Sequence, residues 1–130
     1  MAEGQDPEIN IPEVVAEVRA VFDRYGAALN ANDVAVLNEL FRDASYTVRF
    51  GIGENLYGYK EIAAFRAARV PDGTLRIYRN AVITTFGRDF AATSVELHRD
   101  GAAHIGRQQQ SWVRFAEGWR IVAAHVSVMS

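Results

Sequence analysis

Cysteine is absent from the 130-residue sequence. This absence excludes a disulfide-stabilised fold, a thiolate nucleophile, and zinc or iron–sulfur sites with cysteine ligands. Long apolar runs are also missing, since no stretch approaches the roughly 18 residues that a membrane-spanning helix needs. The first ten residues do not combine a basic segment with an apolar one, as a signal peptide would. We therefore expect a cytoplasmic protein that has no membrane partner.

Lysine is nearly absent as well, because Lys60 is the only lysine among 14 cationic residues and the other 13 are arginines. An arginine side chain stays charged and binds planar carboxylates through a two-pronged fork, whereas lysine is a flexible point charge. A GC-rich genome produces the same bias without any functional meaning. Composition alone leaves both explanations open.

The overall charge is close to balanced, with 16 acids and 14 bases, a net charge of -2 and a pI of about 5.9. A general nucleic-acid binder normally has a strongly basic balance, so we expect no nucleic-acid partner. The charge is nevertheless divided along the chain. Residues 1–43 hold 9 acids and 3 bases, while residues 44–130 hold 7 acids and 11 bases.

The length and the 49% hydrophobic content fit one folded domain without repeats or linkers. We expect residues 1–10 to form a disordered or extended tail and residues 11–130 to form the domain. Apolar residues spaced by three or four positions predict a first helix that includes Val18, Phe22 and Tyr25. A second, short helix is expected to follow Asp33.

After residue 43 the pattern changes to alternation, which predicts a strand with Thr47 and Arg49 on one face. Gly51–Gly53 is expected to be a loop, and a third helix is predicted over about Tyr59–Arg69, with Arg66 on its inner stripe. The remainder predicts four antiparallel strands, at about residues 74–85, 90–99, 103–115 and 119–128. Three helices with a curved antiparallel sheet make an α+β fold.

The last two predicted strands join through a tight hairpin turn at Glu117-Gly118. This turn is expected to pair Ala116 with Trp119. The same register, continued along both strands, predicts which side chains share a face. One predicted face carries Gln108, Gln110, Trp112, Ile121, Ala123, His125 and Ser127. The other carries Arg107, Gln109, Ser111, Val113, Val122, Ala124 and Val126. We expect helices to cover one face and a second subunit to cover the other, and periodicity does not decide which.

Each candidate polar residue also has an ordinary structural explanation. Tyr25 fits a core tyrosine, Arg49 a solvent-facing strand residue, Arg66 a residue that extends its charge to the surface, and His125 a core histidine. The histidines are isolated, without the spacing of a metal site, and the sequence has no phosphate loop, dinucleotide fingerprint or nucleophile elbow. We therefore expect neither a metal nor a cofactor.

Three segments carry a family resemblance: Arg24-Tyr-Gly-Ala-Ala-Leu-Asn-Ala-Asn-Asp33, the glycine-led helix, and the ending Gly118-Trp-Arg-Ile-Val-Ala-Ala-His-Val-Ser127. Together they resemble the nuclear-transport-factor-2-like superfamily, whose members include ketosteroid isomerases and SnoaL-like cyclases. Tyr46–Gly51, Gly58–Arg66 and Gly106–Trp112 resemble the AtzH-like family more narrowly. Members of that family accompany amidases in cyanurate and oxalurate breakdown. The resemblance implies a cone-shaped α+β fold over residues 11–130.

The resemblance also implies roles for individual residues. In ketosteroid isomerases the residue that corresponds to Tyr25 donates a hydrogen bond to a developing oxyanion, and an aspartate on the following strand is the general base. This sequence has Arg49 in place of that aspartate. In the AtzH-like family the corresponding tyrosine and arginine are associated with activity. Tyr25 and Arg49 are therefore the expected catalytic pair.

The implied substrate is a carboxylated urea such as 1,3-dicarboxyurea, which would yield allophanate by hydrolysis or decarboxylation. Buried carboxylates need fixed cationic partners, so Arg49 and Arg66 are expected to bind them, and Gln110, His125 and Ser127 to orient the substrate. Two alternatives remain open. One is a non-catalytic pocket protein that binds dicarboxylates or assists an amidase partner. The other is an isomerase or dehydratase, which requires an acidic residue in the pocket. We also expect a homodimer through the sheet.

Overall fold

The structure is a computed structural model that describes residues 4–130 as three helices and a six-stranded sheet. In chain order the elements are α1 (Pro12–Ala31), α2 (Val34–Leu40), β1 (Val48–Phe50), β2 (Asn55–Tyr57), α3 (Tyr59–Ala68), β3 (Ile77–Phe86), β4 (Phe90–His98), β5 (Gly106–Phe115) and β6 (Gly118–Val128). The strands lie in the order β2-β1-β6-β5-β4-β3, so β2 and β3 are the open edges of the sheet.

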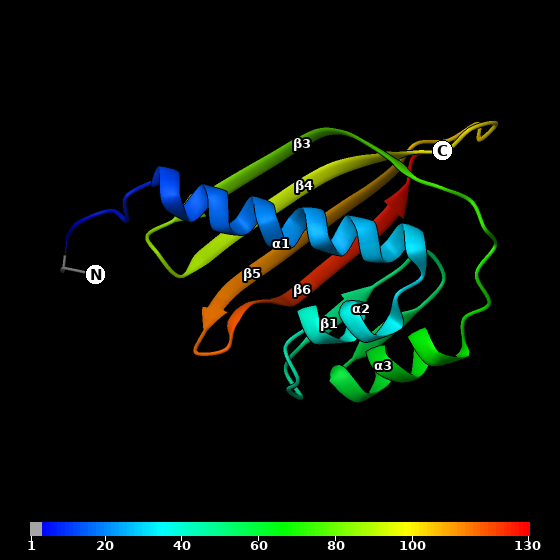
Figure 1. Cartoon of the computed structure of the whole chain (residues 1–130), viewed down its shortest axis with the longest axis horizontal. Coiled ribbons are helices and arrows are strands. Elements are labelled where there is room, and N and C mark those ends of the chain that lie inside the picture. The colour runs from blue at the N-terminus through cyan, green and yellow to red at the C-terminus, as the bar shows by residue number, and fades with distance from the viewer. Residues whose placement is uncertain (1–3) are drawn as a thin grey trace.

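The α1 helix lies across one face of the long strands, and α2 and α3 lie below it beside β1 (Figure 1). This arrangement confirms the expected α+β class with a curved, helix-covered sheet. All strand pairs are antiparallel except one, because β1 runs parallel to β6 and pairs Arg49 with Ala124. That parallel pair places β1, from the first half of the chain, beside β6, the last strand.

The apolar stripe of α1 packs against the sheet as its periodicity predicts. Val14, Val18, Phe22 and Tyr25 are all buried, with Val18 fully so. Pro12 begins the helix, where its missing N–H costs no hydrogen bond. The buried stripe therefore fixes the helix rotation that directs Tyr25 toward the interior of the protein.

Strand β2 is absent from the sequence prediction, which has only a loop between the first strand and the third helix. Its three residues pair with β1, and Leu56 is the only buried one among them. Three residues give too short a pattern for alternation to be recognised. The predicted strands that begin at residues 74 and 103 also start later, at Ile77 and Gly106.

The register predicted for the β5–β6 hairpin is wrong from the turn, because Trp119 pairs with Arg114 and not with Ala116. This shift of two residues leaves the predicted faces unchanged up to Trp112, and a β-bulge reverses them beyond it. Trp112 pairs with Ile121, but Ser111 pairs with Ala123, so Val122 is an extra residue in a β-bulge. A one-residue insertion moves every following side chain to the opposite face. Gln110 consequently pairs with Ala124 and not with His125.

Residues 8–10, the last part of the expected tail, lie along the β3 edge of the sheet. Ile9 bridges to Phe86, the backbone N–H of Asn10 donates to the Thr85 carbonyl at 3.0 Å, and the Asn10 side chain accepts from the Thr85 N–H at 2.8 Å. The prediction for residues 1–3 lies outside the described residues.

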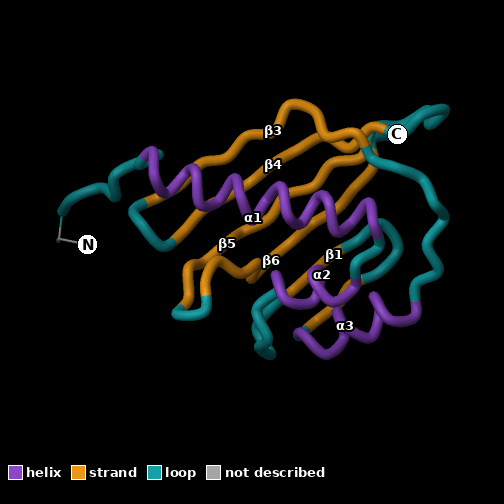
Figure 2. The backbone as a smooth tube through the Cα atoms, in the orientation of Figure 1, coloured by secondary structure: helices purple, strands orange, loops and turns teal. Residues whose placement is uncertain are grey.

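A long irregular connection, residues 69–76, links α3 to β3 around one end of the molecule (Figure 2). In the part of the chain that the structure describes, no helix has the length and apolar character needed to cross a membrane.

Candidate functional site

A cavity of about 400 Å³ lies between the helices and one end of the sheet. Its walls come from the second half of α1, the β1–β2 turn, α3, the residues 69–76 connection and the ends of β4, β5 and β6. The residues that line it are Tyr25, Leu29, Arg49, Ile52, Glu54, Phe65, Arg69, Arg76, Leu97, Arg99, Ala102, Ala103, His104, Gly106, Gln108, Val126, Ser127 and Val128. This volume is typical of pockets for small molecules.

Tyr25 lines this cavity and contacts Arg66, which is not itself one of the lining residues. The Tyr25 side chain is buried against Phe41, with the two rings edge to face at 6.1 Å between centroids. Arg66 Nη2 donates a hydrogen bond to the Tyr25 hydroxyl oxygen at 2.7 Å. A guanidinium has no acceptor atom, so the hydrogen of the Tyr25 hydroxyl is free to be donated elsewhere.

Arg66 is a buried cation without a buried counterion. It is only 3% exposed, and its Nε and Nη1 atoms have no hydrogen-bond partner. Burial lowers its pKa from the ordinary arginine value, and the charges of Arg49 and Arg69 act in the same direction, against the opposing effect of Tyr25. An unpaired buried guanidinium is costly, which makes the part of the cavity beside Tyr25 favourable for an anion.

Arg49 is the second buried cation, and strand β1 places it on the same face as the buried Thr47, as alternation predicts, with that face turned inward. Its side chain is 8% exposed, and its guanidinium carbon lies 5.5 Å from the centre of the Phe65 ring. One nitrogen, Nη1, pairs with Glu54 Oε1 at 2.9 Å, while the buried Nε has no partner. Arg49 therefore retains an unused donor at the cavity wall.

Glu54 is the carboxylate that lines the cavity, and the β1–β2 turn is shaped to hold it. Its Oε2 accepts from the Gly53 N–H at 3.2 Å, and its Oε1 lies where a side chain at Gly51 would be. A Cβ at Gly51 would approach Glu54 Oε1 to 1.8 Å, so the pairing with Arg49 requires glycine at this position. Glu54 is the acidic residue that the isomerase alternative would require in the pocket.

Three more arginines line the same cavity: Arg69, Arg76 and Arg99. Sequence reasoning assigned none of them to the site. Arg69 could have been found, because it lies on the same predicted helical stripe as Arg66, one turn later. Arg76 and Arg99 lie outside regular elements, where periodicity gives no direction. The excess of basic over acidic residues in residues 44–130 is the one sequence feature that points to Arg76 and Arg99.

Gln108 and Gln110 both lie on the helix-covered face of β5, but only Gln108 lines the cavity. Gln108 lines the cavity, and its buried Nε2 has no partner. Gln110 is 3% exposed with both amide atoms unpartnered, but it is not among the residues that line the cavity. Of the two, Gln108 is the one placed to contact a ligand.

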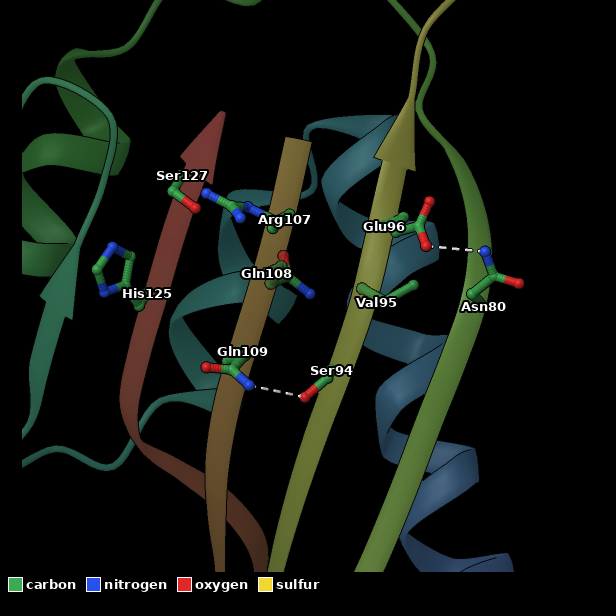
Figure 3. A pocket seen from close by; sticks show the side chains of 9 residues that line it. All are labelled: Asn80, Ser94, Val95, Glu96, Arg107, Gln108, Gln109, His125 and Ser127. Carbon is green, nitrogen blue, oxygen red and sulfur yellow. Dashed lines mark hydrogen bonds between the residues drawn. The ribbon is translucent and has the colours of Figure 1, made fainter. Parts of the chain in front are cut away.

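The expectation that His125 shares a face with Gln110 is wrong, because the bulge at Val122 moves it to the open face of the sheet. Figure 3 shows His125 on β6 beside Arg107 and Gln109 of β5, with α1 behind the strands. His125 is exposed and lines a separate hollow on that face.

Ser127 lies at the end of β6, and it borders both this hollow and the cavity. The structure therefore brings together Tyr25, Arg49, Arg66 and Ser127, and it leaves His125 apart.

The chemistry of the cavity is that of an anion site. Within residues 4–130, no group of three acidic or histidine side chains gathers in a way that could hold a metal ion. The donors that face the cavity are guanidinium, amide and hydroxyl groups, which bind carboxylates by charge-assisted hydrogen bonds. Tyr25 adds a proton that can be shared with a bound oxygen or nitrogen atom.

Comparisons with known proteins agree on family and fold. The family model described as AtzH-like matches residues 7–130. A protein of unknown function from Pectobacterium atrosepticum is 58% identical, with a TM-score of 0.92 over 94% of this chain and 95% of its own. A cystatin-like fold protein from Burkholderia xenovorans is 43% identical, with a TM-score of 0.91 over 95% and 98% of the two chains.

A nuclear-transport-factor-2-like superfamily protein from Salmonella enterica is 20% identical, with a TM-score of 0.75 over 91% of this chain and 92% of its own. At that identity the similarity concerns the fold alone, and it confirms the expected superfamily fold. Among the curated proteins, none matches this chain.

Proposed function

The chain belongs to the AtzH-like family, and we propose that its cavity binds a small carboxylated urea or a related ureido acid and cleaves a C–N bond in it. The observation that carries this proposal is the hydrogen bond from Arg66 Nη2 to the Tyr25 hydroxyl at 2.7 Å. It holds the hydroxyl oxygen as an acceptor and leaves the hydroxyl hydrogen to a ligand in the cavity.

The substrate class follows from the charges around Tyr25. Arg49 and Arg66 are both buried, and each has at least one guanidinium nitrogen without a partner. A carboxylate can accept from such nitrogens in a planar, two-pronged arrangement, and it removes the cost of an uncompensated buried charge. A neutral, apolar ligand would leave that cost in place.

For 1,3-dicarboxyurea the reaction is a proton transfer coupled to loss of one terminal carboxyl group. Tyr25 gives its proton to the nitrogen that bears the departing carboxylate. The bond between that nitrogen and the carboxyl carbon breaks, and the bonding electrons stay on nitrogen. Carbon dioxide and allophanate are the products, and solvent returns a proton to Tyr25. A hydrolytic route would add water at the same carbon and release bicarbonate. Arg49 holds the substrate and disperses its charge.

The binding-protein alternative uses the same cavity without the proton transfer, with or without an amidase partner. It predicts that dicarboxylates bind and that 1,3-dicarboxyurea is not consumed. The isomerase alternative requires a free carboxylate base. Glu54 is a weak candidate for that base because it pairs with Arg49 at 2.9 Å in a cavity lined by several cations. The cationic lining favours an anionic substrate over a ketone.

The test is to incubate the purified protein with freshly prepared 1,3-dicarboxyurea and to follow allophanate and released carbon dioxide together. The proposal predicts equal amounts of both products, formed faster than in buffer. It also predicts at least a tenfold loss of kcat/KM in Arg49→Lys, because lysine lacks the planar fork. Binding of dicarboxylates without any turnover would favour the binding-protein alternative and contradict the proposed reaction.

A further inference from the structure

Three arginines surround the outer part of the cavity, and we call them the mouth arginines: Arg69, Arg76 and Arg99. Arg69 ends helix α3, Arg76 directly precedes β3, and Arg99 directly follows β4. They lie further out than the catalytic pair. The Arg99 side chain is 36% exposed, whereas Tyr25 is 3% exposed.

The position of Arg76 is fixed by α1 and does not depend on a flexible surface contact. The Arg76 backbone N–H donates to the side-chain oxygen of Asn30 at 2.9 Å, and the Asn30 side-chain nitrogen donates to the Arg76 carbonyl at 3.0 Å. Asn30 thus forms hydrogen bonds with both the backbone N–H and the backbone carbonyl of Arg76. This pairing attaches an otherwise irregular connection to the helix that carries Tyr25.

The mouth arginines carry more positive charge than their surroundings compensate. Among the described residues, the ion pair to this group is that of Arg99 with Asp72, and it is long at 3.7 Å. Asp72 is itself 56% exposed and accepts from the Thr74 N–H, so it faces the surface. Burial lowers the pKa of Arg76, and the charges of Arg99 and Arg69 lower it further, which indicates mutual repulsion.

We propose that Arg69, Arg76 and Arg99 form a second anion-binding site at the mouth of the cavity. This site holds the carboxylate at the far end of a ligand whose other end lies at Tyr25 and Arg49. The inference rests on the proposed function for the Tyr25 end and adds to it the means by which the protein selects ligands with two anionic ends. It moves the second carboxylate from Arg66, where the sequence interpretation placed it, to the mouth arginines.

Two features favour a carboxylate at this position. Guanidinium groups on three segments of one cavity wall can donate to both oxygens of a planar anion, which relieves their repulsion. The site also shares one continuous cavity with Tyr25 and Arg49, so a single ligand can reach both ends.

The test compares equilibrium binding of dicarboxylates with that of monocarboxylates of equal carbon number. Malonate, succinate and glutarate would be titrated beside propionate, butyrate and pentanoate, by calorimetry at constant ionic strength. We expect at least one dicarboxylate to bind wild type about tenfold or more tightly than its matched monocarboxylate. Arg76→Gln and Arg99→Gln should each remove most of this difference and change monocarboxylate binding by less than about twofold.

Arg107→Gln is the matched control, because Arg107 is exposed on the open face of the sheet and does not line the cavity. It should retain the full preference for dicarboxylates. The proposal is overturned if wild type shows no such preference, or if the mouth variants weaken both ligand classes equally, as a general loss of positive charge would.

The readout separates this inference from the proposed reaction. If 1,3-dicarboxyurea is not consumed but the mouth variants lose the dicarboxylate preference, the proposed reaction is wrong and the second anion-binding site is supported. If turnover is found and the preference is absent or survives in the mouth variants, the second site alone fails.

Discussion

Arg66 is a buried charge that is costly to the fold and that positions the Tyr25 hydroxyl. Its guanidinium is almost completely buried, and one of its three nitrogens, Nη2, has a partner, the Tyr25 hydroxyl oxygen. A charged group in this environment destabilises the protein unless an anion joins it. Its burial is therefore better explained by its hydrogen bond to Tyr25 and by an anion in the adjacent cavity than by stability.

Replacing this arginine should separate stability from function. Arg66→Met keeps similar volume and removes the buried charge, so we expect unfolding free energy to stay unchanged or to rise by up to about 4 kcal/mol. The same variant should lose the increase in Tm that succinate gives to wild type. Ile62→Ala on the same helix is the comparison, since Ile62 is 1% exposed and should cost about 2–5 kcal/mol. Equal destabilisation by both variants would contradict the account.

At the scale of elements, the β1–β2 hairpin determines which donors of Arg49 a ligand can reach. Strand β1 directs Arg49 inward, and the turn returns the Glu54 carboxylate to the same guanidinium. This arrangement requires glycine at position 51, because a Cβ there would overlap Glu54 Oε1. A bound carboxylate would meet the negative charge of Glu54, so the hairpin limits anion affinity at Arg49.

This competition can be tested by moving the carboxylate. Gly51→Ala places a Cβ on the Glu54 carboxylate, and Glu54→Gln removes its charge. Both should tighten succinate binding by about three- to tenfold, as expected for removing one nearby negative charge. Gly53→Ala is the control, because a Cβ there would meet nothing within 4 Å. Weaker binding in Gly51→Ala than in Gly53→Ala would show that Glu54 positions Arg49 and does not compete with the ligand.

The sequence predicted those parts of the site that regular periodicity determines. Tyr25 follows from the apolar stripe of α1, and the shared face of Thr47 and Arg49 follows from alternation. Alternation did not show that this face points inward, because the opposite face holds the apolar residues Val48 and Phe50. His125 was misplaced because nothing in the local sequence marks a bulge at Val122. Arg76 and Arg99 were missed because their direction depends on contacts between segments that are distant along the chain.

For the whole molecule, one face of the sheet is covered by helices and the other is open. The open face carries Val82, Phe86 and Phe90, which are 58%, 37% and 40% exposed. The predicted face that carries Val113, Val122, Ala124 and Val126 is split by the bulge, since Ala124 is buried and Val126 lines the cavity. A second copy placed on the open face would cover the aromatic and aliphatic groups there.

We therefore predict a homodimer formed through the open face. Light scattering coupled to gel filtration should give twice the chain mass at micromolar concentration, and Val82→Glu should shift the protein toward the monomer. Ala20→Glu, on the exposed side of α1, should remain dimeric. A wild-type protein that is monomeric under these conditions would refute this prediction.

The proposed reaction depends on the free proton of Tyr25, which Tyr25→Phe removes without changing the ring. The decisive measurement is kcat for carbon dioxide release from 1,3-dicarboxyurea by this variant, relative to wild type. Loss of one such donor elsewhere lowers kcat by about 100- to 1,000-fold, and we predict a decrease in that range. A Tyr25→Phe variant that is folded and retains the wild-type kcat would contradict the central claim.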